Sequence, residues 1–182
     1  MKKALLMVDI QNDYFPGGRM QLEGSEAASL RAGALLAAFR ERRMPVFHIQ
    51  HISVRPNATF FLPGTDGVRI HANVAPAGSE PVVQKHFPNA FRETSLLDSL
   101  RQSGVQELVI AGMMTHLCID ATTRAAADLG FKCFLAHDAC ATRALSFGDT
   151  RVPAEQVHYS FISALNGAYA TVQTAAELNK AL

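Results

Sequence analysis

Short apolar runs alternate with segments of helical periodicity along most of this 182-residue chain. The apolar runs predict six β-strands, at residues 4–10, 45–51, 81–85, 107–113, 132–138 and 169–174. The intervening segments predict four helices, at residues 25–42, 94–104, 115–130 and 153–168. Thr94 is the expected N-cap of the second helix, and Pro153 is expected at the first position of the fourth.

Strands that alternate with helices imply right-handed crossovers between parallel strands. We therefore expect a three-layer α/β/α, Rossmann-like arrangement, with a parallel sheet covered by helices on both faces. The length suits a single domain over residues 1–182. Ligands of such sheets bind beyond the carboxyl ends of the strands, so the polar residues at those ends are the candidates for chemistry.

Residues 52–80 are the exception to this alternation. The segment contains Pro, Gly and Asn and has no clear periodicity. A loop of this length in a compact domain is usually functional or mobile, so we interpret it as a candidate lid over a site.

Composition narrows the class of partner. Lys and Arg number 17 against 16 Asp and Glu, so we expect neither nucleic acid nor an acidic membrane surface as a partner, and a small molecule instead. No stretch reads as a signal sequence or a membrane span, and we expect a cytoplasmic protein. Cysteines at 118, 133 and 140 form no CxxC pair, which argues against structural zinc and disulfides.

Three polar residues stand at or just beyond predicted strand ends: Asp9 after the first, Lys85 after the third and Cys118 after the fourth. Each has an ordinary structural explanation: a turn cap, a solvated strand end and a buried thiol in a helix, respectively. Together they supply an acid, a cation and a nucleophile.

The position of Cys118 favours a chemical role. With Thr115 as N-cap, Cys118 occupies the third helical position, where free backbone N–H groups and the helix dipole should lower the thiol pKa. The same N–H groups could stabilise an oxyanion. Asp9 would then carry the proton from the sulfur to a leaving nitrogen, while Lys85 stabilises negative charge.

The segments VDIQNDYFPGG, QKHFPNAFRETSLLDSLRQSGVQELVIAGMMTHLCIDATTRAAADLGF and the following HDAC closely resemble the isochorismatase-like cysteine hydrolases. The resemblance covers essentially the whole chain and implies a catalytic triad of Asp9, Lys85 and Cys118, with a sheet of six parallel strands in the order 3-2-1-4-5-6. It also implies a cis peptide bond at Met113–Met114 and an oxyanion hole formed by the backbone N–H groups of Met114 and Cys118. Further implied are a homodimer or homotetramer, no cofactor, and a substrate pocket that could include Phe15, His51, His71, Phe91 and His116.

Two departures within that family narrow the reaction. Isochorismatases proper have a small residue in place of the nucleophilic cysteine, so Cys118 favours hydrolysis of an amide or ureido C–N bond through a thioester. Nicotinamidases bind a metal through an Asp-x-His motif after the second strand, whereas this chain reads HIQHISV there. His48 and His51 are also an odd number of positions apart and point to opposite faces of a strand, so we expect no bound metal.

Other functions stay open. Cys118 and Arg124 satisfy the Cys-x5-Arg spacing of phosphatases, but the stretch lacks glycine and already reads as a helix. No GxGxxG follows the first strand, which argues against a nucleotide-binding module. The remaining alternatives are an isochorismatase-type or other non-amide hydrolase on the same fold, a non-enzymatic binding protein, and a redox sensor with Cys133 or Cys140 as the resolving thiol.

Overall fold

The structure is a computed structural model that describes all 182 residues. Its main sheet has six strands in the order β3-β2-β1-β4-β5-β8, and every neighbouring pair is parallel. The strands are β1 (Lys3–Val8), β2 (Val46–His51), β3 (Val82–Lys85), β4 (Glu107–Met113), β5 (Lys132–Ala141) and β8 (Ala170–Gln173). The predicted strand order is therefore confirmed, because β8 is the sixth strand of the sheet along the chain.

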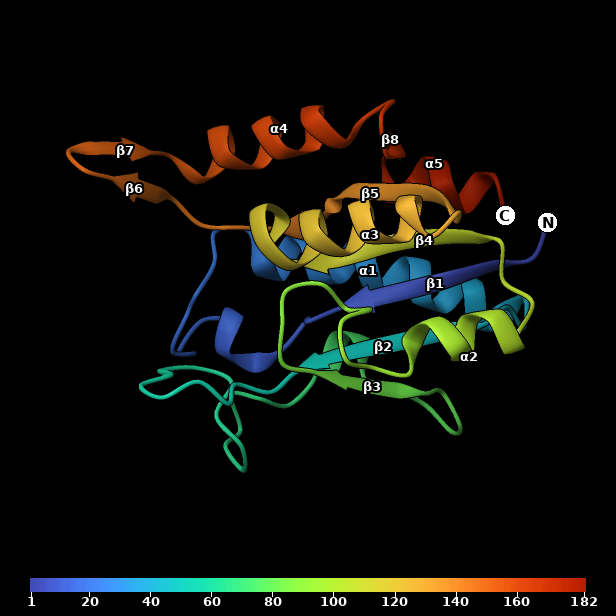
Figure 1. Cartoon of the computed structure of the whole chain (residues 1–182), viewed down its shortest axis with the longest axis horizontal. Helices are drawn as coiled ribbons and strands as arrows, with labels where there is room; N and C mark the ends of the chain where they lie inside the picture. Colours follow the sequence, from blue (N-terminus) through green and yellow to red (C-terminus); the bar gives the residue numbers. More distant parts are fainter.

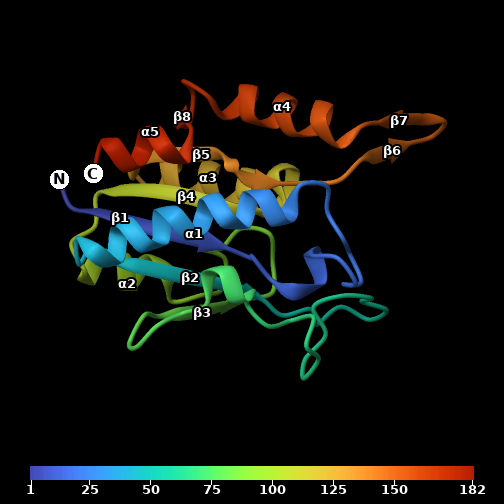
Figure 2. The ribbon, with the colours of Figure 1, turned by 180° about the vertical axis from the view of Figure 1, so that it is seen from behind.

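Helices cover both faces of the sheet, as the alternating pattern predicted. Helices α1 (Ser25–Glu41) and α5 (Ala175–Lys180) lie on the face seen in Figure 2. The opposite face, seen in Figure 1, carries α2 (Leu96–Gln102), α3 (Asp120–Asp128) and α4 (Ala154–Leu165). Each face has its own apolar core, of 24 and 22 buried residues. None of the helices combines the length and the apolar character needed to cross a bilayer.

Several short elements escaped the sequence patterns. A hairpin of β6 (Leu145–Phe147) and β7 (Thr150–Val152) projects from the domain between β5 and α4 (Figure 1). Two single-turn helices, η1 (Asn12–Tyr14) and η2 (Ala72–Val74), lie in loops. Two helix starts also differ from expectation. Ser95, not Thr94, is the N-cap of α2, and Pro153 is the N-cap of α4 instead of its first residue.

The carboxyl ends of β1 and β4 approach each other unusually closely at Gly112. This glycine has φ of 139° and pairs with Val8, and a Cβ atom built on it would lie 1.9 Å from the Val8 carbonyl oxygen. A residue with a side chain cannot occupy this position without moving one of the strands. The close approach brings the residue after β1 next to the turn that follows β4, on the left in Figure 1.

Candidate active site

Asp9, Lys85 and Cys118 meet in one buried cluster at this end of the sheet. The Lys85 Nζ atom lies 2.6 Å from Asp9 Oδ2 and 3.4 Å from Cys118 Sγ. Asp9 is fully buried, and Lys85 and Cys118 are only 1% and 3% exposed. The predicted spatial convergence of an acid, a cation and a thiol is therefore confirmed.

Different backbone features bring each of these side chains into the cluster. Asp9 follows β1 with φ of 51°, a left-handed conformation that turns the chain sharply out of the strand. Lys85 is the last residue of β3 and pairs in register with His51 of β2. Cys118 lies in the π-helical turn η3 (Thr115–Ile119), which connects β4 to α3.

The turn that carries Cys118 is wider than an α-helical turn. The backbone N–H groups of Leu117 and Ile119 both donate to the Met114 carbonyl, at 3.1 and 3.2 Å. The expected Thr115 cap is wrong, because Met114 is the N-cap and the Thr115 hydroxyl hydrogen-bonds instead to His158 Nδ1 at 2.9 Å. The Met113–Met114 peptide bond is cis, as the family resemblance implied.

The Lys85 ammonium is surrounded by acceptors. Besides Asp9 and Cys118, it contacts His51 Nδ1 and the Phe87 carbonyl oxygen, each at 3.0 Å. Because the ammonium can only donate, His51 Nδ1 accepts, and the ring proton lies on Nε2. Asp9, His51 and Cys118 each offer one atom within 4.8 Å of the others, a grouping that could suit a metal ion. The Lys85 ammonium, however, contacts all three of these residues.

The charge states of the cluster differ from the sequence expectation. Burial raises the pKa of the Cys118 thiol, and the neighbouring Asp9 carboxylate raises it further, more than Lys85 lowers it. The expected low thiol pKa is therefore wrong, because loss of solvation outweighs the helix-end effect at a residue that is only 3% exposed. In the resting site, Cys118 is a thiol.

The Asp9 carboxyl is suited to receive that proton. Burial raises the pKa of Asp9 more than the Lys85 ammonium lowers it, which makes the carboxylate a stronger base. Its Oδ1 atom has no hydrogen-bond partner. Oδ2 lies within ion-pair distance of the Lys85 ammonium. Lys85 keeps its charge, because burial lowers its pKa less than Asp9 and Cys118 together raise it.

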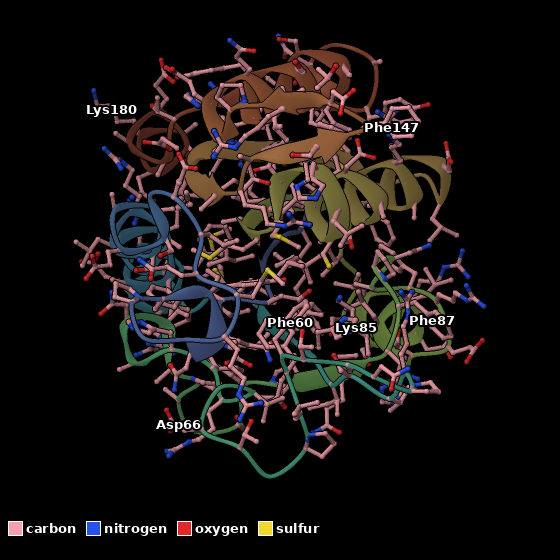
Figure 3. All side chains as sticks on the ribbon, turned by 90° about the vertical axis from the view of Figure 1, so that its left-hand side faces the viewer. Phe60, Asp66, Lys85, Phe87, Phe147 and Lys180 are labelled. Carbon is pink, nitrogen blue, oxygen red and sulfur yellow. The ribbon has the colours of Figure 1, made fainter.

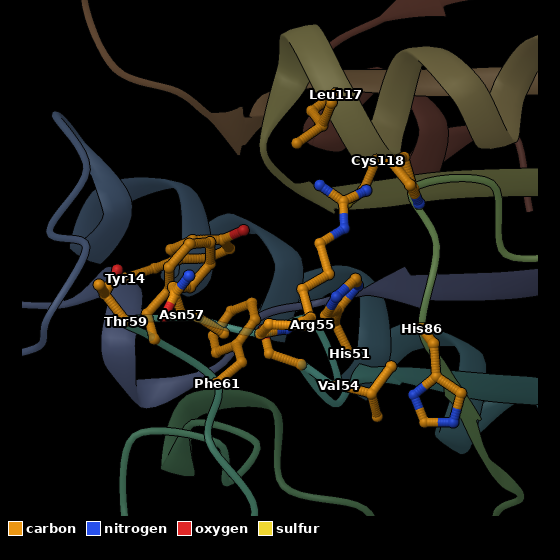
Figure 4. Close-up of a pocket in the computed structure, with 15 residues that line it drawn as sticks. Tyr14, His51, Val54, Arg55, Asn57, Thr59, Phe61, His86, Leu117 and Cys118 are labelled. Carbon is orange, nitrogen blue, oxygen red and sulfur yellow. The ribbon is translucent and has the colours of Figure 1, made fainter.

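A pocket of about 320 Å³ opens onto Cys118 (Figure 4). Most of its wall comes from the first part of the 52–80 segment, and the remainder comes from η1, β2, the loop after β3 and η3. The lining residues are Tyr14, His51, Ser53, Val54, Arg55, Pro56, Asn57, Ala58, Thr59, Phe60, Phe61, His86, Pro88, Leu117 and Cys118. Figure 3 views the molecule onto this end, with Lys85 near the centre and Asp66 at the margin.

Among the residues expected in the pocket, only His51 lines it. Phe15 and His71 instead stack on each other with ring centroids 3.6 Å apart, and Phe91 packs near Phe131. His116 hydrogen-bonds through Nδ1 to the Thr142 hydroxyl. The expectation for these four was wrong because each side chain contacts another part of the protein instead: the first three pack against aromatic rings, and His116 forms a hydrogen bond.

Two residues of the stretch DIQND, directly after β1, anchor the 52–80 segment, a role that sequence reasoning missed. The buried Asp13 carboxylate accepts the N–H groups of Phe61 and Arg19 at 2.6 and 3.1 Å. The Gln11 side-chain amide donates to the carbonyl oxygens of His51 and Val68. Both residues are polar and lie in a turn region, so the sequence alone did not distinguish them from exposed residues of a surface loop.

The phosphatase alternative is not supported by the position of Arg124. Its guanidinium donates to Asp120 at 2.9 Å on α3 and lies over the Tyr169 ring at 4.6 Å. It therefore does not close a cradle around Cys118.

The chain is similar to known proteins in both sequence and fold. The sequence model of the isochorismatase domain family matches residues 3–177. YddQ, an uncharacterized isochorismatase family protein of Bacillus subtilis (strain 168), is 53% identical over 174 residues, which cover 96% of this chain and 97% of YddQ. A crystal structure named as an isochorismatase hydrolase from Oleispira antarctica has a TM-score of 0.94 at 50% identity, covering 98% of this chain and 96% of that one. Maleamate amidohydrolase of Pseudomonas putida is 31% identical over 159 residues, which cover 78% of this chain and 73% of that protein.

Proposed function

The chain belongs to the isochorismatase family of hydrolases, and from that premise we propose that it hydrolyses a C–N bond of a small amide or ureide through a thioester on Cys118. A relative named as an amidohydrolase supports this substrate class. The buried cluster of Asp9, Lys85 and Cys118 supports the mechanism.

The first half-reaction acylates the sulfur. Cys118 Sγ forms a bond to the substrate carbonyl carbon while its proton passes to the Asp9 carboxylate. The resulting tetrahedral intermediate collapses as Asp9 returns the proton to the nitrogen, the C–N bond breaks, and ammonia or an amine leaves. A thiol with a raised pKa beside a basic carboxylate fits proton transfer that accompanies attack, instead of a pre-formed thiolate.

Two groups stabilise the negative charge that develops. The Lys85 ammonium lies against both the carboxylate and the sulfur, so it balances charge on either one as the proton moves. We assign the oxyanion to the backbone N–H groups of Met114, the N-cap of η3, and of Cys118 within η3. In the second half-reaction a water molecule loses its proton to Asp9 and attacks the thioester, which releases the acid and regenerates the thiol.

One observation carries this proposal: a single ammonium contacts the carboxylate at 2.6 Å and the sulfur at 3.4 Å, beside a pocket that reaches the sulfur. The test is a screen of small amides, ureides and N-carbamoyl amino acids with detection of released ammonia. On any substrate found, Cys118→Ala should lower kcat/KM by at least about 10³-fold. Cys133→Ala is the matched control and should keep its activity. Cleavage of esters or vinyl ethers with no C–N substrate at all would favour a non-amide hydrolase.

The redox alternative has less support from the other two thiols. Cys133 and Cys140 are buried, and burial raises the pKa of each to about 12. Their sulfurs donate to the carbonyl oxygens of Phe131 and Ala136. Thiols in this state are poor partners for thiol–disulfide exchange.

A further inference from the structure

The wall of the pocket carries an unpaired positive charge. Arg55 extends from the 52–80 segment into the pocket, and its guanidinium points toward Cys118 (Figure 4). No carboxylate of the protein lies within salt-bridge distance of it. A guanidinium offers a planar fork of donors that matches a carboxylate.

The rest of the pocket does not offset this charge. None of its 15 lining residues is Asp or Glu. His51 is neutral at physiological pH, because burial and the nearby Lys85 lower its pKa to about 3. Asp9 and Lys85 beneath the pocket form an ion pair with no net charge. Arg55 is thus the one lining side chain that carries a permanent charge.

The remaining wall limits the size and character of the ligand. Val54, Phe60, Phe61 and Leu117 provide apolar surface within a volume of about 320 Å³. A carbonyl at Cys118 would be joined to an anionic group at Arg55 by a short, largely apolar body. A single guanidinium, with no second permanently charged lining group, suits a carboxylate better than a phosphate dianion.

We propose that the substrate is an amidic or ureido acid, whose carboxylate pairs with Arg55 while its amide carbonyl faces Cys118. This inference rests on the proposed amidohydrolase function and makes Arg55 the determinant of substrate class. A hydrogen-bonded charge pair of this kind is worth about 10- to 100-fold in discrimination, with the lower end expected because Arg55 is exposed.

The test compares malonamate, succinamate and glutaramate with malonamide, succinamide and glutaramide, which replace the carboxylate by a neutral amide of the same shape. For the preferred chain length, kcat/KM should be about 10- to 100-fold higher for the acid. Arg55→Met should bring this acid-to-diamide ratio close to one, and Arg55→Lys should give an intermediate ratio because it keeps the charge without the fork. Arg69→Met is the matched control, since Arg69 pairs with Asp66 in the same segment and lines none of the pocket. It should leave the ratio unchanged.

A binding measurement separates this inference from the proposed reaction. Calorimetric titration of the Cys118→Ala protein with the same six compounds should show tighter binding of the acids, and Arg55→Met in that background should abolish the preference. Arg55-dependent binding without turnover by the wild type would uphold the carboxylate site at Arg55 and count against the proposed hydrolysis. Turnover of diamides and acids at equal kcat/KM would overturn the inference alone. So would an acid preference that survives Arg55→Met, or absence of binding by every acid.

Discussion

Lys85 Nζ lies 2.6 Å from Asp9 Oδ2, and neither side chain is exposed to solvent. Two opposite charges taken out of water stabilise each other only as a pair, so the loss of one partner leaves the other uncompensated. This pairing links the stability of the fold to the chemistry of the site, because the same ammonium contacts Cys118.

A double-mutant cycle should reveal this dependence. Lys85→Met should lower the free energy of unfolding by about 3–5 kcal/mol, because the Asp9 carboxylate would stay buried without its cation. The loss of unfolding free energy in the double variant Asp9→Asn/Lys85→Met should be smaller than the summed losses of the two single variants, by at least about 1 kcal/mol. Urea unfolding of the four proteins measures the coupling. Additive losses would mean that the ion pair is not a stabilising unit.

Gly112 should tolerate no side chain. Gly112→Ala would place Cβ 1.9 Å from the Val8 carbonyl oxygen at φ of 139°. We therefore expect the free energy of unfolding to fall by about 3 kcal/mol or more, and most of the activity to be lost. Gly167→Ala is the control, since φ is 80° there but nothing lies within 4 Å of the added Cβ, and about 1 kcal/mol should be lost. Thermal unfolding of both variants makes the comparison. Similar losses in the two would show that β1 and β4 can separate at little cost.

The Asp13 carboxylate should control the order of the pocket wall. Asp13→Ala removes the acceptor of the Phe61 and Arg19 N–H groups. The Phe61 N–H is buried, and leaving it unpaired should cost about 1–3 kcal/mol. Amide hydrogen exchange in peptides covering Phe61 should become faster, and KM should rise more than kcat falls. The control is Asp66→Ala, at a side chain 75% exposed. Unchanged exchange around Phe61 would show that the wall is held by other contacts.

Glu80 should make stability depend on acid pH. Arg40 lowers the pKa of Glu80 to about 2 through two hydrogen bonds of 2.7 Å, with further help from the Ala77 N–H and His48. A carboxyl with a lowered pKa in the folded state contributes stability above about pH 4.5, and this is lost as the pH falls toward 2. The free energy of unfolding of the wild type should therefore exceed that of Glu80→Gln by on the order of 1 kcal/mol at pH 7. The difference should shrink as the pH falls from about 4.5 toward 2. Urea unfolding at a series of pH values checks this; a constant difference would contradict it.

The sheet and the residues of the Asp9–Lys85–Cys118 cluster could be predicted from the chain because their signals are local. Continuous apolar runs mark parallel strands buried on both faces, and the residue after each run lies at the carboxyl edge of the sheet. Asp9 and Lys85 were found in this way, and Cys118 was found from its place in the first helical turn beyond the fourth run. Their convergence also needed the strand order, which only the family resemblance implied.

The pocket could not be predicted because its contacts are non-local and polar. Asp13 reaches Phe61, and Gln11 reaches Val68, across more than forty residues. No periodicity in the chain marks such bonds. The state of Cys118 was also missed, since its position in a helical turn is visible in the sequence but its burial among packed strands is not.

The proposed hydrolysis of a C–N bond requires that Cys118 become acylated during turnover, with Asp9 carrying the proton. The direct measurement is the intact mass of protein quenched during turnover of a substrate found by the ammonia screen, followed by peptide mapping of the adduct. We expect a mass increase equal to the acyl group, located on Cys118 and absent from Cys118→Ala. Turnover by Cys118→Ala at the wild-type rate, or an acyl group on another residue, would contradict it.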